Sequence, residues 1–234
     1  MSRKMLINAT GSEELRVAVV EEGRLQAFYV ETAAQAQTRG NIYKGVVANV
    51  EPSLQAAFID YGRPKHGFLQ IADLRNDLWG EHQAPARGLP PLQEVLKKGR
   101  SFLVQVVKEE TGNKGAALTT HLSIPGQYLV VTPGHSHAGV SRQIADDKER
   151  TRIKQVLDSL DRSDGLGVIA RTAAEGRSKR ELTTNYKQLQ RLWSDIEKRG
   201  KSAKPRTLIH KEEELAVRTV RDPVSYTHLT LPTN

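Results

Sequence analysis

Residues 56–69, AAFIDYGRPKHGFL, decide the fold class of their region and raise its first functional question. Two short apolar runs flank the turn sequence YGRP, a pattern typical of neighbouring strands. Read with a period of two, Phe58 and Phe68 fall on the faces that also carry polar residues. Ile59 and Leu69 fall on the opposite faces. Two of the chain's four phenylalanines are therefore predicted to point away from the core.

This stretch lies in a β-rich region in which turn signals such as EPS and TGNKG separate short apolar runs. Five short strands at this spacing suit a small barrel, of which the OB type is one option. The polar stretch 75–99, which contains several prolines, is predicted to be an irregular excursion. The predicted strands are Tyr43–Val50, Gln55–Tyr61, Gly67–Ile71, Ser101–Glu109 and Ala116–Leu122.

Exposed aromatic rings beside cations are typical of barrels that bind single-stranded nucleic acid. Each stacked base contributes roughly 1–3 kcal/mol, and nearby cations attract the phosphates. On this interpretation Phe58 and Phe68 form a stacking platform and Lys114, in the turn TGNKG, supplies a cation. Lys44 and Tyr61 are weaker candidates. The alternative is a one-residue bulge that reverses the parity and turns both rings into the core.

The segments on either side of the barrel have different patterns. Before it, MLINAT and Leu15–Glu31 read as strands, and the second reverses at Glu21–Gly23 as a hairpin. After it, QYLVVTP and GLGVIART read as strands, and ADDKERTRIKQVLDSLDR reads as a helix that begins with acidic residues. A second helix, 178–199, begins with a capping-box sequence at Ser178 and ends at Gly200. A further strand, followed by a helix, is predicted in TLIHKEEELAVRTVRD. The predicted fold class is α+β.

The amino-acid composition excludes several classes of protein and of site. The 234 residues are 38% hydrophobic, contain no cysteine and have no apolar run near the ~20 residues that span a membrane. Disulfides and cysteine zinc sites are thereby excluded within this chain, and a reducing cytoplasm is expected. The N-terminus reads as mature protein and not as a signal peptide. Ten of the chain's Lys and Arg residues, against three acids, lie in Arg177–Arg206, which indicates either a polyanion partner or a solvated helix face.

Seven motifs, in this order and spacing, resemble the N-terminal half of the ribonuclease E/G family. They are MLINATGSEELRVAVV, NIYKG, EPSLQAAFIDYG, HGFL, GNKGAALTT, GVSRQI and ARTAAEG. The resemblance runs from about Met5 to Asp222. It implies an S1 RNA-binding barrel of the OB type inserted in a split RNase H-like subdomain and followed by a small α/β 5′-sensor subdomain. The implied domains are 1–37 (first RNase H-like part), 38–122 (S1), 123–204 (5′-sensor) and 205–222 (start of the second RNase H-like part).

The same resemblance assigns roles to particular residues. Phe58, Phe68 and Lys114 match positions that bind single-stranded RNA. The residues matching a 5′-monophosphate sensor are Arg171, Thr172, Arg142 and, as an apolar position lining the pocket, Val130. An arginine fork and a neighbouring hydroxyl suit a terminal monophosphate, while the bulk and charge of a triphosphate would need more room. From the residues alone, an ordinary surface arginine is the alternative.

Catalytic groups are not apparent in the sequence. Hydrolysis of this type needs carboxylates that hold Mg²⁺, and Asp146–Asp147, Glu109–Glu110 and Glu212–Glu214 read as solvated acidic clusters. The resemblance implies that the catalytic aspartates, and the cysteines that bind Zn²⁺ between protomers, lie beyond this chain. Residues 223–234, PVSYTHLTLPTN, carry no Lys, Arg, Asp or Glu and are interpreted as a non-native tail. A less stable end with an exposed apolar strand edge is expected after Lys204.

Three functional hypotheses follow. The first is the substrate-binding half of a single-strand-specific endoribonuclease of RNA processing and decay, inactive alone, that prefers 5′-monophosphorylated RNA. The second is a stand-alone RNA-binding module, and the third is a basic protein whose helix at 178–199 binds another protein. The resemblance further implies a homodimeric or homotetrameric full-length parent. MLINAT favours the E branch of the family and ARTAAEG the G branch.

Overall fold

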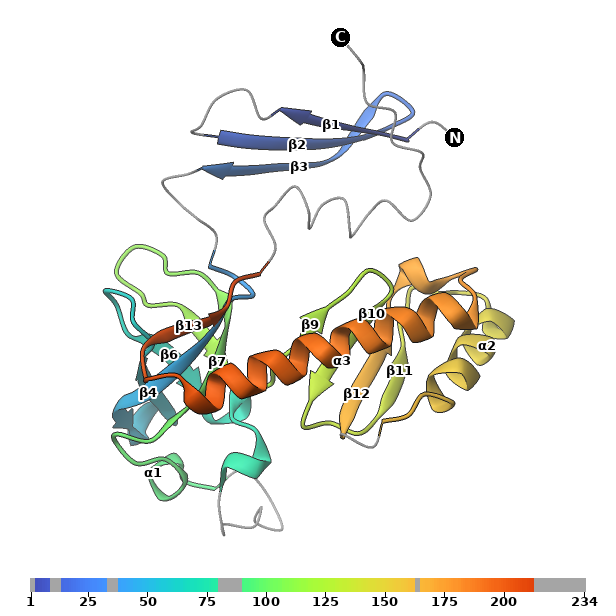
Figure 1. Cartoon of the computed structure of the whole chain (residues 1–234). Coiled ribbons are helices and arrows are strands. Elements are labelled where there is room, and N and C mark those ends of the chain that lie inside the picture. Colours follow the sequence, from blue (N-terminus) through green and yellow to red (C-terminus); the bar gives the residue numbers. More distant parts are fainter. Residues whose placement is uncertain (1–2, 9–13, 33–37, 80–89, 163–164, 213–234) are drawn as a thin grey trace. The chain divides into compact units, whose positions relative to one another are not determined.

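The structure, a computed structural model, describes residues 3–8, 14–32, 38–79, 90–162 and 165–212 (Figure 1). These residues fall in two compact units, one N-terminal to residue 38 and one formed by residues 38–212. Both α-helices and β-sheets are present, and a closed five-stranded barrel lies in the second unit. The predicted α+β class with an OB-type barrel is therefore confirmed.

The N-terminal unit is an antiparallel sheet of β1 (Arg3–Asn8), β2 (Glu14–Glu21) and β3 (Arg24–Thr32) in that order. The predicted hairpin is confirmed: Glu22 and Gly23 turn the chain with φ values of 49° and 79°. Positive φ at both central residues matches the right-handed twist of the flanking strands. The large apolar side chains exposed on this sheet are Leu6, Ile7, Leu25, Phe28 and Val30.

The barrel closes through the order β4–β5–β6–β8–β7 and back to β4. Only the β6–β8 pair is parallel among these five pairings. Its interior is filled by apolar side chains such as Ile59, Leu69 and Val104, because alternate residues of each strand point inward. The strands are β4 (Ile42–Glu51), β5 (Ala56–Asp60), β6 (Gly67–Gln70), β7 (Ser101–Lys108) and β8 (Ala117–Thr119).

The stretch 75–99 contributes to the barrel core, which the prediction of an irregular excursion missed. Asn76–Trp79 is a 3-10 turn, and α1 (Leu92–Val95) is a single helical turn. Trp79 and Leu92 are buried against the barrel interior. Residues 80–89 of the predicted excursion lie outside the described part of the chain.

Strand β4 pairs with three other strands, which contact different parts of its length. Its first half pairs with β7 on one side and with β13 (Thr207–His210) on the other, and its second half pairs with β5. A register shift between Val47 and Asn49 interrupts the pairing of β4 with β5, as a β-bulge does. Strand β13 follows the long helix α3 (Lys179–Ser202) and so brings the chain back to the barrel (Figure 1).

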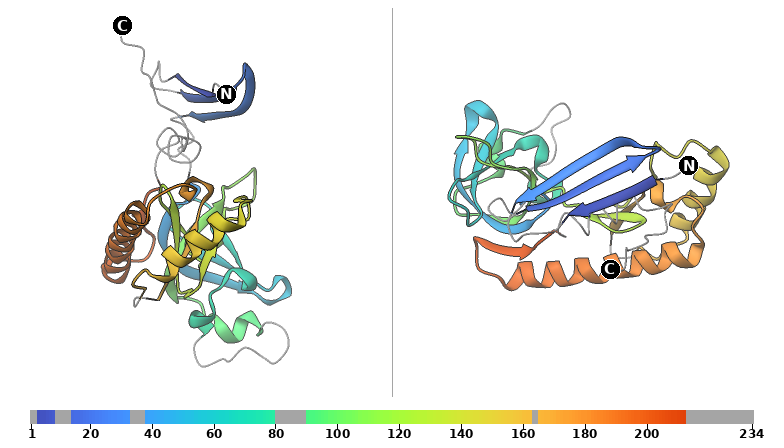
Figure 2. Two further views of the ribbon diagram at one scale, coloured as in Figure 1. Left: turned by 90° about the vertical axis from the view of Figure 1, so that its right-hand side faces the viewer. Right: turned by 90° about the horizontal axis from the view of Figure 1, so that it is seen from above.

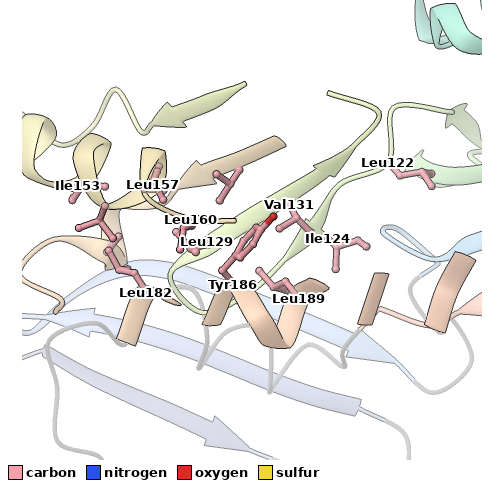
Figure 3. Close-up of a cluster of buried hydrophobic side chains, with 14 of the residues drawn as sticks. Leu122, Ile124, Leu129, Val131, Ile153, Leu157, Leu160, Leu182, Tyr186 and Leu189 are labelled. Atoms are coloured by element: carbon pink, nitrogen blue, oxygen red, sulfur yellow. The ribbon is translucent and has the colours of Figure 1, made fainter. Parts of the chain in front are cut away.

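The segment after the barrel forms a four-stranded sheet in the order β11–β12–β10–β9. Helices α2 (Asp147–Asp158) and α3 (Lys179–Ser202) supply the apolar side chains that cover it. Figure 3 shows Tyr186 and Leu189 of α3 pointing toward Leu129 and Val131 of the sheet. The strands are β9 (Ile124–Pro125), β10 (Leu129–Pro133), β11 (Ala138–Val140) and β12 (Leu166–Ala170).

Both helices start where their sequences predict. Asp146 caps α2 by accepting the N–H of Lys148, and Ser178 with Glu181 forms the complete capping box of α3. The bonds that Ser178 donates lower the pKa of the Glu181 carboxyl. The predicted helix end at Gly200 is nearly right, because α3 continues for two residues and then leads into β13 (Figure 2).

Candidate nucleic-acid interface

Phe58 and Phe68 lie directly opposite each other on the antiparallel strands β5 and β6. Their rings meet edge to face, with centroids 5.9 Å apart and planes at 64°, and both side chains are partly exposed. The register runs without a shift from Ala56–Gln70 to Ile59–Gly67, which excludes the bulge that would have turned the rings inward. The outward orientation predicted from the parity is therefore confirmed.

The two rings line a cavity of about 670 Å³ on the barrel surface, a volume within the usual range for ligand sites. The turn that follows β7 also lines this cavity, and Lys114 belongs to that turn. The structure therefore brings together the three residues that the sequence singled out from separate segments. The lining residues are Phe58, His66, Phe68, Lys108, Glu109, Thr111, Asn113, Lys114, Gly115 and Ala117.

The turn carrying Lys114 is held tightly against the barrel. Thr111 and Lys114 exchange two backbone hydrogen bonds, of 3.1 and 2.9 Å, and the ammonium of Lys65 donates to the carbonyl of Gly112. A Cβ at Gly115 would lie 1.9 Å from the carbonyl oxygen of His66, so only glycine permits this approach. The exposed Lys114 side chain thus starts from a fixed backbone position beside the rings.

The charges around the cavity favour an anion. Lys108 and Lys114 contribute two cations, and Glu109 is the single acid among the lining residues. The carboxylate of Glu109 accepts the backbone N–H groups of Thr38, at 2.6 Å, and Arg39, at 3.2 Å. Lys108 was missed in the sequence, although its place at the exposed end of β7 was a usable signal.

Tyr61 does not belong to this interface, and its inclusion among the RNA-binding candidates is corrected. Its side chain is 1% exposed and meets the ring of Tyr43 edge to face at 5.1 Å inside the barrel. Burial, together with the nearby Glu110 carboxylate, raises the pKa of Tyr61 to about 12. A ring enclosed in the core has no face on which a base can stack.

Lys44 lies in a different place from the phenylalanines. Its ammonium is 3.4 Å from the carbonyl oxygen of Lys201, close to the end of α3. It lines a separate cavity of about 320 Å³ together with Trp193 and residues of β7. Cations are favourable near a helix C-terminus, so this position suits the Lys44 ammonium, and RNA binding by Lys44 stays a prediction.

A second group of predicted residues gathers at one end of the sheet β11–β12–β10–β9. Strands β11 and β12 are parallel neighbours, with Val140 opposite Ala170. Arg142 and Thr172 each follow their strand by two residues, so the two turns that carry them leave the sheet at the same end. The Thr172 hydroxyl lies 3.5 Å from the side-chain oxygen of Gln143. Parallel pairing therefore brings Arg142 and Thr172 into neighbouring turns, although they are far apart in the sequence.

Arg171, directly after β12, is hydrogen-bonded to the segment around β10, the neighbour of β12 opposite to β11. Its backbone N–H donates to Tyr128 at 2.8 Å, and its guanidinium donates to the carbonyl of Gly126 at 2.8 Å. Val130 is partly exposed and lies opposite Ile169, on the face of β10 away from the buried core. The four predicted sensor residues thus lie in or directly after three adjacent strands, β11, β12 and β10. Gly126 was missed, because a backbone carbonyl leaves no trace in the sequence pattern.

Neither a metal-ligand cluster nor a membrane-spanning helix occurs in the described parts of the chain. No group of three or more His, Asp or Glu side chains there is placed to hold a metal ion. None of the helices in those parts is both long enough and apolar enough to cross a membrane.

Comparison with known proteins gives a consistent assignment. Residues 123–231 match the model of the ribonuclease E/G family. The chain is 45% identical over 221 residues to ribonuclease E of Haemophilus influenzae and 43% identical to that of Escherichia coli K12, covering 94% of this chain and 23% and 21% of those proteins. It is 40% identical over 225 residues to Escherichia coli K12 ribonuclease G, covering 95% of this chain and 45% of that protein.

The chain thus spans less than half the length of these curated relatives. The matches to both ribonucleases nevertheless extend over nearly all of this chain, from the N-terminal sheet through the barrel and the sheet that follows it. On these grounds the chain belongs to the ribonuclease E/G family.

Proposed function

We propose that this chain binds single-stranded RNA for an endoribonuclease of RNA processing and decay and recognises a 5′-monophosphate at a separate site. The observation that carries the proposal is the cavity of about 670 Å³ in which Phe58, Phe68 and Lys114 meet. Bases would stack on the two rings, and the ammonium of Lys114 would pair with the backbone phosphate. Stacking tolerates any base, so this site would recognise single strands with little sequence preference.

The 5′-phosphate would bind where the turns after β11 and β12 meet. Arg171 would offer a guanidinium oriented by its bond to Gly126, Thr172 a hydroxyl, and Arg142 a second guanidinium. A terminal monophosphate presents three oxygens to such donors, and arginine forks bind phosphate through paired hydrogen bonds. Val130 would contact the terminal nucleotide, because its side chain is apolar and partly exposed on the same sheet.

Cleavage is assigned to groups outside the described residues, among which no three or more His, Asp or Glu side chains are placed to hold a metal ion. The Mg²⁺ dependence, the Zn²⁺ between protomers, the homodimeric or homotetrameric parent and the cytoplasmic location remain predictions from the family resemblance. This chain alone is expected to bind RNA without cutting it.

The proposal is tested by fluorescence anisotropy with one short unpaired RNA carrying either a 5′-monophosphate or a 5′-hydroxyl. Both are titrated with the unmodified chain, Phe58→Ala and Arg171→Ala, with Mg²⁺ present and a gel to detect cleavage. We expect Phe58→Ala to weaken both RNAs and Arg171→Ala to remove only the preference for the monophosphate. Equal binding of both RNAs by all three chains would refute the proposed sites, and cutting by the purified chain would refute the assignment of catalysis elsewhere.

A further inference from the structure

Helix α2 contacts both turns that carry the proposed phosphate ligands. Its residues Glu149 and Arg150 are consecutive, so their side chains leave the helix about 100° apart. Glu149 bonds to the turn after β12, and Arg150 bonds to the turn after β11. Two neighbouring side chains of one helix therefore hold the two halves of one site.

Arg150 closes the turn that contains Arg142. One guanidinium nitrogen, Nη1, donates to the carbonyl of Ser141 at 2.7 Å and to that of Ile144 at 3.2 Å. These carbonyls lie at the two ends of a four-residue turn in which Arg142 and Gln143 are the central residues. These two bonds also give the carbonyl groups of Ser141 and Ile144 a hydrogen-bond donor from outside the turn.

Glu149 holds the turn that contains Thr172. Its Oε1 accepts the backbone N–H of Gly176 at 2.8 Å, just after the 3-10 turn Thr172–Ala174. Arg152 fixes the carboxylate through two parallel bonds, of 2.7 Å to Oε2 and 2.6 Å to Oε1. The Glu149 side chain is only 15% exposed, whereas the carboxylate of an ordinary ion pair on a helix surface is open to solvent. The bonds from Arg152, with the one from Gly176, lower the pKa of Glu149 to about 2, so it is ionised at neutral pH.

We propose that Glu149 and Arg150 are positioning residues of the 5′-phosphate site: together they set the separation between Arg142 and Thr172. The inference rests on the proposed function of that site and adds the element that organises it. A phosphate that is held by donors from two turns requires a fixed distance between those turns. Charge-assisted hydrogen bonds weaken quickly when a donor is displaced from its position. The turns are tied directly to each other by the Ser141 N–H, which donates to Ala170 at 2.8 Å, and helix α2 braces each one from outside.

The test uses the whole chain with Glu149→Ala, Arg150→Met and the conservative variants Glu149→Gln and Arg150→Lys. Lys148→Met is the matched control, because it removes one positive charge from an exposed position of the same helix. Arg150→Met removes the same charge together with the bonds to the turn. The readout is the ratio of affinities for 5′-monophosphate and 5′-hydroxyl RNA. Loss of a bracing bond is expected to lower this ratio roughly three- to tenfold, with binding of the 5′-hydroxyl RNA unchanged.

The conservative variants separate positioning from folding. A lysine at 150 can still donate to both carbonyls, so Arg150→Lys should retain most of the preference. Glu149→Gln can still accept from Gly176 but cannot pair with the Arg152 fork, so its effect should be intermediate. These two variants decide the question if the larger truncations fail to fold. Hydrogen exchange provides a second readout, in which Glu149→Ala should accelerate exchange at Gly176 and Arg150→Met at residues 141–144.

Each outcome decides between specific claims. A full preference retained by both Glu149→Ala and Arg150→Met, while Arg171→Ala loses it, overturns the inference and leaves the proposed function standing. An equal loss of affinity for both RNAs assigns the two residues a general structural role and also overturns it. If the unmodified chain shows no monophosphate preference, the proposed sensor itself fails, and the inference fails with it.

Discussion

Truncating Phe58 is predicted to weaken RNA binding far more than it weakens the fold. The ring is partly exposed and contacts Phe68 edge to face at 5.9 Å, so folding loses little buried apolar area. The bound state loses a stacking partner worth roughly 1–3 kcal/mol, which corresponds to about a 5- to 150-fold rise in Kd. Anisotropy titration with an unpaired RNA measures the first effect, and urea unfolding measures the second.

A double-mutant cycle with Phe68→Ala sharpens this prediction. Because the two rings support each other, each single truncation also disturbs the ring that remains. The double variant is therefore expected to lose less binding free energy than the sum of the single losses, with a coupling of about 0.5–1.5 kcal/mol. Phe28→Ala is the matched control, since it removes a phenylalanine that is 56% exposed on the N-terminal sheet.

The result that would refute the stacking argument is clear. If Phe58→Ala, Phe68→Ala and the double variant all bind RNA within twofold of the unmodified chain, with intact unfolding curves, the rings do not stack bases. A loss as large in Phe28→Ala would show that the effect is not specific to this cavity. Additive losses in the cycle would instead mean that each ring binds its base independently.

Four further predictions concern charge, packing and pH. Lys114→Ala should lower the slope of log affinity against log salt by about 0.7, as expected for one phosphate contact on a single strand. Gly115→Ala should destabilise the fold by about 1–3 kcal/mol in urea unfolding, because the new Cβ would collide with the His66 carbonyl at 1.9 Å. Glu149 has a folded pKa lowered from 4.5 to about 2, so its stabilisation is present above pH 4.5 and is lost as pH falls toward 2; Glu149→Gln should flatten that part of the stability profile. Ser178→Ala should cost about 1 kcal/mol through loss of the capping box, visible as a lower urea midpoint.

Local patterns predicted most of the elements. Period-two alternation placed the strands of the barrel and the outward rings of Phe58 and Phe68, because a strand's alternate side chains occupy opposite faces. The Ser178 capping box and the turn at Glu22–Gly23 were equally visible, since each depends on residues within a few positions. Tyr61 lies two residues after Ile59, so the same alternation puts it on the inward face, and naming it as an RNA contact went against that pattern.

Features that depend on distant partners were not predictable in this way. The burial of Trp79 arises from packing across the barrel, so the polar residues around it read as a loop. Lys44 was singled out for its charge, but its neighbour Lys201 is brought to it by the pairing of β13 with β4. The braces formed by Arg150 are bonds to backbone carbonyls, which every residue possesses, and so they carry no sequence signature.

The pairing of β13 with β4 has a consequence for the order in which the chain acquires its structure. Strand β4 is made early and already has its barrel partners β5 and β7, whereas β13 appears only after the sheet and α3 that precede it. Contacts between such distant segments form slowly, because a long loop must close first. During synthesis the barrel can therefore assemble before its last edge is covered, and docking of β13 would be a late step. Pulse-labelling hydrogen exchange should accordingly show protection in the barrel strands β5 and β7 before it appears in β13, which pairs with β4.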